Sequence, residues 1–522
     1  MTTPGKTRIR NAGNGRLLNS QASLNGYIKS ICDIMRRSNC AGALQYVPEL
    51  TWMLFLRILD EREEREGEEA AALGVNFTPS LSHPCRWRDW ASPDGSKRQE
   101  LQAGPMGGFM EFVNNNLLPH VRYLGDRPGA THRQLVVSQV FATVERTRID
   151  TERNLLDILD KVDALTEQSV DDTHMFPLSQ VYEGLLLKMG EKNNDGGQFF
   201  TPREVIRAMV RAVDPKIGQT VYDPCCGTGG FLAQAYEHMY GDAQDRAADI
   251  ELLKTGTFYA REKENLVYPV ALANLMLHGI DAPNVWHGNT LTGVTSHGVL
   301  YTDAPAQFDV VLTNPPFGGK ESKDAQANFA YKTGATQLLF LQHVIDALAD
   351  GGTCGIVMDE GALFRTNEIA FVQTKRKLLD ECDLFCIVSL PPKVFMNAGA
   401  ASKTNLLFFR KGRSTERIWY YDLSDVKVLK KTPLTLGNFE DFFQRLSLPS
   451  EDPERESERS WWVSVEEVRA SNYDLKAVNP NRKDTGDTRT PEELIAIIES
   501  GSAELSEALA ALRKSLSEGG TK

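Results

Sequence analysis

Short apolar runs alternate with helical patterns between about residue 175 and residue 411, and this alternation constrains the fold more than any other feature of the chain. Parallel strands need a crossover connection long enough to hold a helix, so such an alternation is typical of a mainly parallel sheet with helices on both faces. The sequence therefore predicts an α/β fold, a doubly wound Rossmann-like domain. The expected strands are residues 220–223, 257–260, 285–287, 308–314, 352–359, 384–390 and 405–411.

Helical patterns occupy the chain before this domain. Residues 46–71 place apolar side chains on one helical face before a charged run, and residues 151–167 also place theirs together. We expect both segments to be core helices, because neither holds a group of reactive side chains. The apolar positions are Leu50, Met53, Leu54, Ile58 and Leu59 in the first segment and Leu155, Leu156, Ile158, Leu159 and Val162 in the second.

These patterns divide the chain into four expected parts. Residues 446–460 are charged and contain prolines, which favours a linker or an exposed loop after the α/β domain. The parts are an all-helical N-terminal domain at 1–170, the α/β domain at 171–415, an extension and linker at 416–485, and a C-terminal partner-binding helix at 486–522.

The final helix has a clear start signal. Thr490 takes the N-cap position, Pro491 the first helical position and Glu493 the capping-box position. Apolar residues then repeat about every 3.5 positions, which predicts a seam that packs against a partner helix or folds back on the chain's own N-terminal helices. The seam consists of Leu494, Ile498, Leu505, Leu509, Leu512 and Leu516.

Composition excludes several classes of function. A net charge of −12 argues against a chain that holds nucleic acid alone over a broad surface, because such binding depends on Lys and Arg that neutralise phosphates. No stretch approaches the roughly 18 apolar residues of a membrane span, and the first residues lack the apolar core of a secretory signal. The eight cysteines form no C-x-x-C pair, so we expect no metal site and a reducing, cytoplasmic setting.

The first expected strand runs into VYDPCCGTGGFL (221–232). In this segment Asp223 is followed by Gly227, Gly229 and Gly230, and then by a helix. Glycines let the backbone approach a ligand closely, and N–H groups at a helix N-terminus point toward such a ligand. The spacing is not the dinucleotide pattern G-x-G-x-x-G, so the loop by itself fits a cofactor site and a tight turn equally well.

Glu262 follows the second expected strand. A carboxylate at this place can accept hydrogen bonds from both hydroxyls of a ribose, although a surface glutamate explains the residue equally well by itself. Glu262 lies 32 residues beyond Gly230 (262 − 230). That separation exceeds the roughly 20 residues of a compact dinucleotide unit. The polar segment 241–256 accounts for the excess as an inserted loop.

The fourth expected strand ends in Asn314, Pro315, Pro316 and Phe317. Asn-Pro-Pro is most often only a turn, because proline has no N–H to continue a ladder. Here the turn should lie at the carboxyl edge of the sheet, beside the glycine loop. The Asn314 amide oxygen and the Pro315 carbonyl could then accept the hydrogens of a planar amino group while Phe317 stacks on a flipped base. Accepting those hydrogens favours a tetrahedral nitrogen that can attack, so we expect a catalytic site.

The combination of DPCCGTGG (223–230), Glu262 and NPPF (314–317) resembles the S-adenosyl-L-methionine-dependent methyltransferases that act on amino groups. GGQFFTPREV (196–205), upstream of the glycine loop, resembles the γ motif order of N6-adenine DNA methyltransferases. Four further segments make the chain similar, over residues 20 to 520, to the modification (M) subunit of type I restriction–modification systems. They are VYEGLLLKMG (181–190), ANLMLHGI (273–280), SLPPKVF (389–395) and NYDLKAVNP (472–480).

The resemblance implies a role for each matching residue. Two positions depart from the family pattern: Asn289 in GNTL (288–291) replaces the usual adenine-binding Asp, and Glu262 lies in AREKE (260–264) instead of after Gly-Gln. The implied catalytic residues are Asn314, Pro315, Pro316 and Phe317. The implied cofactor-binding residues are Gln198, Phe199, Thr201, Pro202, Asp223, Gly227, Thr228, Gly229, Gly230, Glu262 and Asn289.

The resemblance also implies an activity and partners. The activity is methyl transfer from S-adenosyl-L-methionine to N6 of adenine in double-stranded DNA, with the base flipped out. The partners are a specificity subunit that sets the target, a second copy of this chain in the same complex with that specificity subunit, and a restriction subunit. Only about 110 residues follow the last expected strand, and they contain no basic, aromatic-rich reader of DNA.

Two other functions remain open from the sequence. One is a non-catalytic scaffold subunit that keeps the fold, and the other is methyl transfer to cytosine N4 or to a protein glutamine. Retention of Asn314 and of the loop glycines argues against the scaffold. Cofactor binding by the isolated protein would separate it from an enzyme.

Overall fold

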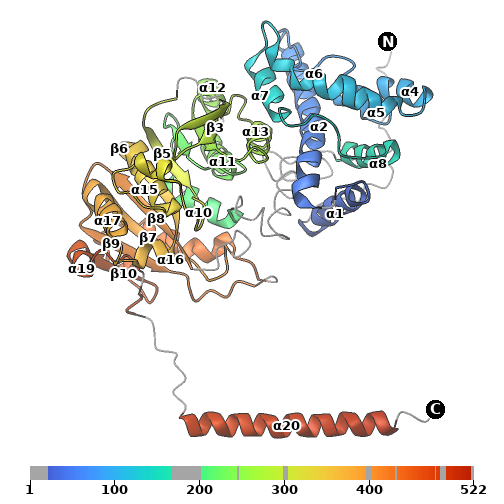
Figure 1. Ribbon diagram of the computed structural model, residues 1–522. Coiled ribbons are helices and arrows are strands. Elements are labelled where there is room, and N and C mark those ends of the chain that lie inside the picture. The colour runs from blue at the N-terminus through green and yellow to red at the C-terminus, as the bar shows by residue number, and fades with distance from the viewer. Residues whose placement is uncertain are drawn as a thin grey trace, which may run out of the picture. The chain divides into compact units, whose positions relative to one another are not determined.

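The computed structural model divides the chain into two compact units, Met1–Val478 and Asn479–Lys522 (Figure 1). Among the described residues, no helix combines the length and apolar character that a membrane crossing requires. The described residues are 21–40, 42–165, 201–243, 246–297, 304–395, 403–429, 432–476, 478–481 and 490–518.

The first unit begins with a helical domain built around α2 (Ala43–Ala72). Its middle is buried on all sides and not only on the expected face, since other helices surround it. Trp52 stacks on Trp90 with ring centroids 6.4 Å apart, and Phe55 lies 6.2 Å from Phe141. The other elements are α1 (Gln21–Arg37), α3 (Trp87–Trp90), α4 (Ser96–Ala103), α5 (Gly108–Glu111), a π-helix (Phe112–Leu117), α6 (Leu118–Arg122), a 3₁₀ turn (Leu124–Asp126), α7 (His132–Val140) and α8 (Glu152–Asp163).

The apolar face expected for residues 151–167 is confirmed. In α8 four of its five predicted side chains are buried, and Leu156 is half-buried. Burial of each contributes roughly 1.5–3 kcal/mol relative to exposure, so this face docks the helix. The buried four are Leu155, Ile158, Leu159 and Val162.

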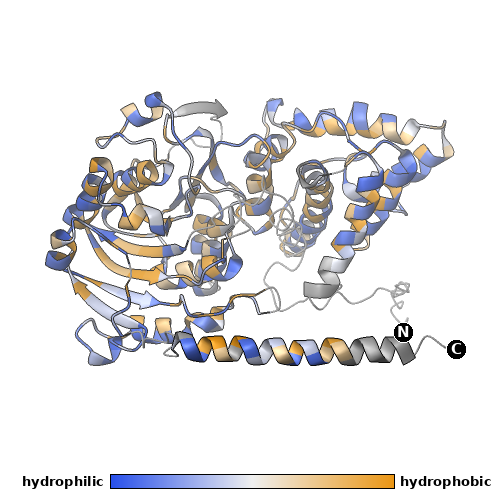
Figure 2. Cartoon of the chain, turned by 60° about the horizontal axis from the view of Figure 1, so that its bottom comes forward, coloured by the Kyte–Doolittle hydropathy of each residue, from blue (hydrophilic) through white to orange (hydrophobic). Residues whose placement is uncertain are grey.

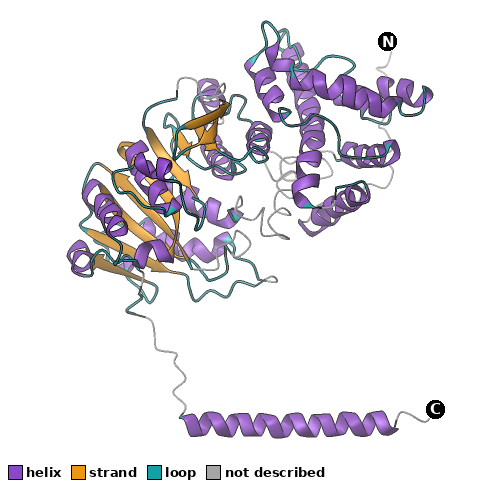
Figure 3. Cartoon of the chain, in the orientation of Figure 1, coloured by secondary structure: helices purple, strands orange, loops and turns teal. Residues whose placement is uncertain are grey.

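Ten described strands form one sheet in the order β10-β9-β7-β8-β6-β5-β1-β2-β3-β4 (Figure 3). All the expected strands are confirmed, and β4, β9 and β10 are additional. The bounds are β1 (Val221–Asp223), β2 (Phe258–Glu262), β3 (Asn284–Asn289), β4 (Val294–His297), β5 (Phe308–Thr313), β6 (Leu348–Asp359), β7 (Cys382–Ser389), β8 (Thr404–Lys411), β9 (Arg417–Asp422) and β10 (Ser460–Ser464).

The strand directions set the position of a ligand crevice. Strands β3, β2, β1, β5 and β6 run parallel, and β8 lies antiparallel between β6 and β7. The chain moves outward from β1 in both directions, with β2 on one side and β5 on the other. Ligands bind such sheets outside the carboxyl ends of the strands at this switch point.

Helices cover both faces of the sheet, which confirms the doubly wound prediction. Val221 and Tyr222 are neighbours on β1, yet they belong to two different apolar cores, as successive strand residues should. One core includes side chains of α10 (Arg203–Val213), α11 (Gly230–Ala243) and α13 (Tyr268–Leu277), and the other includes those of α15 (Thr336–Ala347), α16 (Glu360–Phe364) and α17 (Ile369–Glu381). Shorter helices are α12 (Ala247–Thr255), α14 (Lys323–Ala327), α18 (Glu440–Leu446) and α19 (Val465–Ala470), with 3₁₀ turns at Leu436–Phe439 and Pro453–Arg455.

Residues 416–485 differ from the expected extension and linker. Strand β9 pairs in parallel with β7, and β10 pairs antiparallel with β9, so the segment enlarges the sheet. Within the expected loop at 446–460, Arg455 is buried and its guanidinium lies 4.7 Å above the ring of Trp419. The charges and prolines of residues 446–460 are typical of a loop. This segment is nevertheless packed, because it covers aromatic side chains of β9.

The second unit contains α20 (Pro491–Glu518). Its predicted capping box is confirmed: the Thr490 N–H donates to the Glu493 carboxylate at 2.8 Å, and the Glu493 N–H donates to the Thr490 hydroxyl at 3.2 Å. Apolar and polar residues alternate along the helix (Figure 2). Three side chains of the predicted seam are exposed, Ile498, Leu505 and Leu509, and Ile495 beside them is exposed as well. Leu494 is half-buried, and the side chains of Leu512 and Leu516 lie outside the described residues.

Candidate active site

A cavity of about 390 Å³ opens at the switch point, outside the carboxyl ends of β1, β2 and β5. The structure brings most predicted site residues to this cavity. Gln198 and Phe199 lie outside the described residues, and Pro202, Thr228, Gly229, Gly230 and Pro315 are near the cavity in sequence but do not line it. The predicted residues that line it are Thr201, Asp223, Gly227, Glu262, Asn289, Asn314, Pro316 and Phe317.

The glycine loop follows β1 and leads into α11. Gly227 and Gly229 have φ angles of 54° and 79°, a backbone conformation that other residues rarely adopt. Gly229 faces away from the cavity: a Cβ atom there would lie 3.1 Å from the side chain of Leu275. Gly229 therefore serves packing of the loop on α13 and not close approach to a ligand, which differs from the sequence-based explanation.

Asp223 ends β1 and is buried. Its carboxylate accepts a hydrogen bond from the Thr313 hydroxyl at 2.7 Å and from the Cys225 N–H at 3.2 Å. Burial raises the pKa of Asp223 to about 7, although both hydrogen bonds act in the opposite direction. The residue ties the end of β1 to the end of β5, so it fixes the edge on which the cavity is built.

Glu262 ends β2 and binds the glycine loop. Its Oε2 accepts from the Gly227 N–H at 2.9 Å, and its Oε1 accepts from the N–H groups of Lys263 and Glu264 at 2.8 Å each. Burial raises the pKa of Glu262 to about 7, opposed by these three N–H groups. A carboxylate has roughly four acceptor positions, so one remains on Oε2. Both hydroxyls of a ribose would have to share that position.

Asn314 follows β5, and among the described residues only the nitrogen of its side-chain amide has a hydrogen-bond partner. The amide nitrogen donates to the Thr201 hydroxyl at 3.0 Å. The amide oxygen is buried and has no hydrogen-bond partner within the described part of the chain. Buried acceptors are rarely left without a donor in a folded protein, so this oxygen marks a place for a donor from a ligand.

The turn around Asn314 is supported from α15. The Gln337 amide nitrogen donates to the Pro315 carbonyl at 3.4 Å, and the Gln337 amide oxygen accepts from the Asp359 N–H at 3.0 Å. Phe317 lies edge-to-face with Phe395, with ring centroids 5.3 Å apart and planes at 68°. The contact from Gln337 fixes the Pro315 carbonyl, which has a second lone pair, and the contact with Phe395 holds Phe317 beside the cavity.

Asn289 lines the cavity from the end of β3. Its amide oxygen accepts from the Leu291 N–H at 3.0 Å, which closes a local turn. The neighbouring Thr290 hydroxyl donates to the Pro224 carbonyl at 2.6 Å and joins this turn to the loop after β1. With its oxygen engaged in the turn, the Asn289 amide nitrogen is the group that could serve an adenine acceptor.

Several polar residues of the cavity were missed from the sequence. Lys263 and Glu264 directly follow Glu262, a position that could have suggested them. Glu321 and Thr336 also line the cavity, and the Thr336 hydroxyl donates to the Glu321 carboxylate at 2.9 Å. Thr336 begins α15 and reaches the site only through the fold, so no sequence signal marks it.

The residues of the cavity fit the expected cofactor. An S-adenosyl-L-methionine offers ribose hydroxyls as donors, for which the free position on Glu262 is suited. An amino group offers hydrogens to the buried, unpartnered oxygen of Asn314. The two groups line one cavity, so a cofactor and an amine could meet there.

Two known protein families match most of the chain. The family described as N-6 DNA Methylase matches residues 173–488, and the family described as HsdM N-terminal domain matches residues 24–162. The type I restriction enzyme EcoEI methylase subunit of Escherichia coli is 33% identical over 495 residues, which cover 93% of this chain and 96% of that protein.

Other relatives agree with these matches. The type I restriction enzyme StySPI methylase subunit of Salmonella potsdam is 30% identical and covers 84% of this chain and 78% of its own length. A chain from a structural study of complex assembly and conformational transition in a type I restriction–modification system has a TM-score of 0.70 and 36% identity, covering 96% of this chain and 99% of its own. A modification subunit structure from Vibrio vulnificus YJ016 has a TM-score of 0.74 and 30% identity, covering 89% and 98%.

Proposed function

We propose a function from the premise that this chain belongs to the N-6 DNA methylase family and is the modification subunit of a type I restriction–modification system. In this proposal the cavity holds S-adenosyl-L-methionine beside a flipped adenine. The enzyme transfers a methyl group to N6 of adenine in double-stranded DNA. The bound cofactor supplies an electrophilic methyl group, and the protein residues position the two reactants and present the amine.

The cofactor lies against the glycine loop and the ends of β2 and β3. Glu262 accepts a ribose hydroxyl at its remaining acceptor position, and Asn289 contacts the adenine ring of the cofactor. Asp223, Gly227 and Thr201 border the methionine part. This placement is supported by the way these residues line one continuous cavity at the switch point of the sheet.

The hydrogen bonding of the Asn314 side-chain amide is the single observation that best supports catalysis. Its nitrogen is engaged by Thr201 while its oxygen is buried and lacks a protein donor within the described residues. The oxygen accepts one hydrogen of the adenine amino group, and the Pro315 carbonyl accepts the other. Accepting hydrogen bonds from both hydrogens would favour a tetrahedral nitrogen whose lone pair could take the methyl group. The electron pair of the broken S–C bond would remain on the sulfur of the cofactor, and the amine proton would leave to water.

Phe317 supports the flipped base. Its ring borders the cavity and is fixed by edge-to-face contact with Phe395. An aromatic face held in this way can stack on a base of any sequence context. Stacking replaces part of the stacking energy that the base loses when it leaves the duplex.

We place sequence recognition in another chain. A net charge of −12 disfavours strong binding to DNA by this chain alone. A specificity subunit supplies the target sequence, two copies of this chain assemble with it, and a restriction subunit joins the complex. The complex acts on cellular DNA, which locates it in the cytoplasm.

The proposal is tested by labelled methyl transfer. The chain is purified with and without its specificity subunit and incubated with duplex DNA and methyl-labelled S-adenosyl-L-methionine. We expect N6-methyladenine as the labelled nucleoside after digestion, at one sequence and only with the specificity subunit. Label at cytosine N4, on protein, or nowhere would contradict the proposed chemistry.

A further inference from the structure

Helix α13 packs directly against the glycine loop that borders the cavity. The Asn274 amide nitrogen donates to the Thr228 carbonyl at 2.9 Å, and the Asn274 side chain is fully buried. The next residue, Leu275, lies where a side chain on Gly229 would have to go. Two adjacent residues of one helix therefore shape the loop.

The hydrogen bond to Thr228 has a specific structural purpose. Gly227 and Gly229 have positive φ angles and turn the backbone on both sides of Thr228. Thr228 itself is buried, so its carbonyl needs a donor from the protein. Asn274 supplies that donor and thereby holds the peptide that separates the two glycines.

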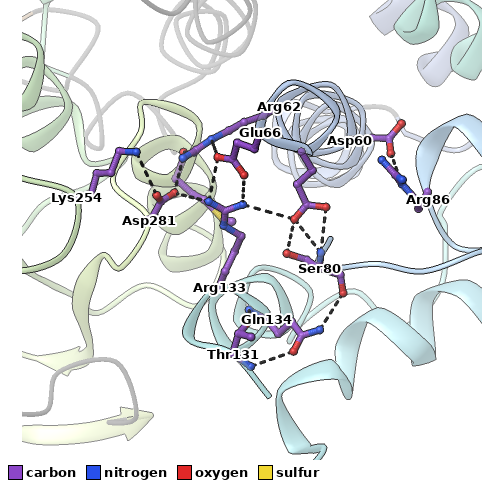
Figure 4. A network of polar contacts seen from close by, with 12 residues as sticks. Asp60, Arg62, Glu66, Ser80, Arg86, Thr131, Arg133, Gln134, Lys254 and Asp281 are labelled. Atoms are coloured by element: carbon purple, nitrogen blue, oxygen red, sulfur yellow. Dashed lines mark hydrogen bonds and ion pairs between the residues drawn. The ribbon is translucent and has the colours of Figure 1, made fainter. Parts of the chain in front are cut away.

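The same C-terminal end of α13 is held by the helical domain. From α2, Arg62 donates through Nη1 to the Met276 carbonyl at 2.8 Å. Just after the helix, Asp281 accepts from Arg62 and, at 3.2 Å, from Arg133 of α7. Lys254 Nζ lies 3.8 Å from the same carboxylate. Figure 4 shows how these charged side chains meet.

A second carboxylate completes this network. Glu66 of α2 accepts from Arg62 at 3.0 Å and from Arg133 at 3.1 Å. Burial raises the pKa of Glu66, but Arg133 and Arg62 outweigh that effect and hold it below its usual value. The side chains of Arg62, Glu66 and Asp281 are only 16–24% exposed, so loss of one charge leaves the others poorly compensated.

We propose that Asn274 is a positioning residue for the cofactor loop, and that the Arg62–Glu66–Arg133–Asp281 network makes the helical domain part of the support for that loop. The inference rests on the proposed function, because it assumes that the cofactor binds at the loop. Cofactor affinity then depends on how the helical domain docks on α13. By thermodynamic linkage, bound cofactor also strengthens that docking.

The first test is Asn274→Asp in the full chain. The variant keeps the size of the side chain but replaces the N–H donor with an oxygen that faces the Thr228 carbonyl. We expect the Kd for S-adenosyl-L-methionine, measured by calorimetry, to rise at least about tenfold, as loss of a buried hydrogen bond predicts. In the complete complex KM for the cofactor should rise while kcat at saturating cofactor stays within a few fold, a split that general destabilisation does not produce.

The second test is Asp281→Asn, which removes the central charge of the network at a residue that does not line the cavity. We expect a weaker cofactor affinity and faster hydrogen exchange at residues 226–230. The matched control is Glu440→Gln, which neutralises a carboxylate in an exposed pair with Arg211 at 2.8 Å. This control should bind the cofactor as the unchanged protein does.

The outcomes separate the two proposals. Unchanged affinity in both Asn274→Asp and Asp281→Asn overturns the inference and leaves the proposed function standing. Absence of binding in the unchanged chain contradicts the proposed function itself. If Asn274→Asp does not fold, the partly exposed Asp281→Asn still decides, since normal affinity in that variant overturns the role of the helical domain.

Discussion

The amide nitrogen of Asn314 donates to the hydroxyl of Thr201 at 3.0 Å, across 113 positions of the sequence. The bond joins the end of β5 to the segment before α10 and leaves the amide oxygen buried without a partner among the described residues. The hydrogen bond from Asn314 to Thr201 therefore fixes the direction in which the Asn314 amide oxygen points.

Asn314→Ala should abolish most methyl transfer while cofactor affinity stays within a few fold. The amide oxygen contacts the amine and is absent from the cofactor contacts, so its loss lowers turnover more than binding. We expect kcat to fall at least about 100-fold, the usual cost of removing one group that stabilises a transition state. Labelled methyl transfer and calorimetry measure the two quantities separately. Near-normal turnover in this variant would contradict the catalytic role of Asn314.

Thr201→Val should lower kcat by about tenfold, and Thr201→Ser should restore most of it. Valine keeps the shape of threonine but offers no oxygen to the Asn314 amide nitrogen, so the amide can rotate away. Serine keeps the hydroxyl and serves as the matched control. Equal activities of the two variants would show that the hydroxyl is unimportant.

Gly229→Val should weaken cofactor binding because the loop must move away from α13. A Cβ atom at this position would lie 3.1 Å from Leu275, and the φ of +79° strains any branched residue. Gly241→Val is the control, since a side chain there meets no atom within 4 Å. We expect circular dichroism to show a folded protein in both cases. Tight cofactor binding by Gly229→Val would mean that the shape of the loop does not matter.

Cofactor binding should strengthen as pH rises through about 7, because a ribose hydroxyl prefers the charged form of Glu262, whose pKa is raised to about 7. Binding near this pH should therefore release protons, which calorimetry in buffers of different ionisation enthalpy detects. Glu262→Gln should bind weakly and lose this pH dependence. A profile that stays the same in the variant would assign the titration to another group.

The stability of the free protein should change in the opposite direction. Asp223 and Glu262 both have pKa values raised to about 7 by burial, so the folded state retains protons that the unfolded state releases. Their contribution to stability is fully present below the unfolded pKa values, near 4, and is lost as pH rises to about 7. Thermal unfolding of Glu262→Gln should show a shallower decline of Tm between pH 5 and 7 (roughly this window) than the unchanged protein.

Truncation after Asp487 should reduce assembly with the specificity subunit without loss of the first compact unit. The removed helix α20 exposes Ile498, Leu505 and Leu509, and such a seam favours a helical partner. Leu505→Glu should weaken assembly as well, whereas Ser506→Glu, one position away on another face, should not. Light scattering after size exclusion measures the complex. Unchanged assembly of the truncated chain would exclude α20 as the docking element.

The sheet and the core of the site could be predicted from the sequence because their signals are local. Apolar runs mark the strands, and the polar residues that end β1, β2 and β5 necessarily meet at one edge of a parallel sheet. Asp223, Glu262 and Asn314 all line the cavity for that reason.

The remaining features depend on packing between distant segments. Thr336 begins a helix and looks like an ordinary N-terminal residue until α15 brings it to Glu321. Strand β9 follows a charged loop and precedes another, so the local pattern places its aromatic run in an extension. The role of Asn274 is equally hidden, because its partner Thr228 lies 46 positions away.

The pairing of β9 with β7 has a consequence for any attempt to isolate the α/β domain. A chain that ended at residue 415 would retain β7, but the backbone groups that β9 engages would become a free edge. This edge would present the apolar run around Ile387 to solvent, together with open N–H and C=O groups. Such an edge is a template for pairing with another copy, so the shortened protein should aggregate where one that extends past β10 stays monodisperse.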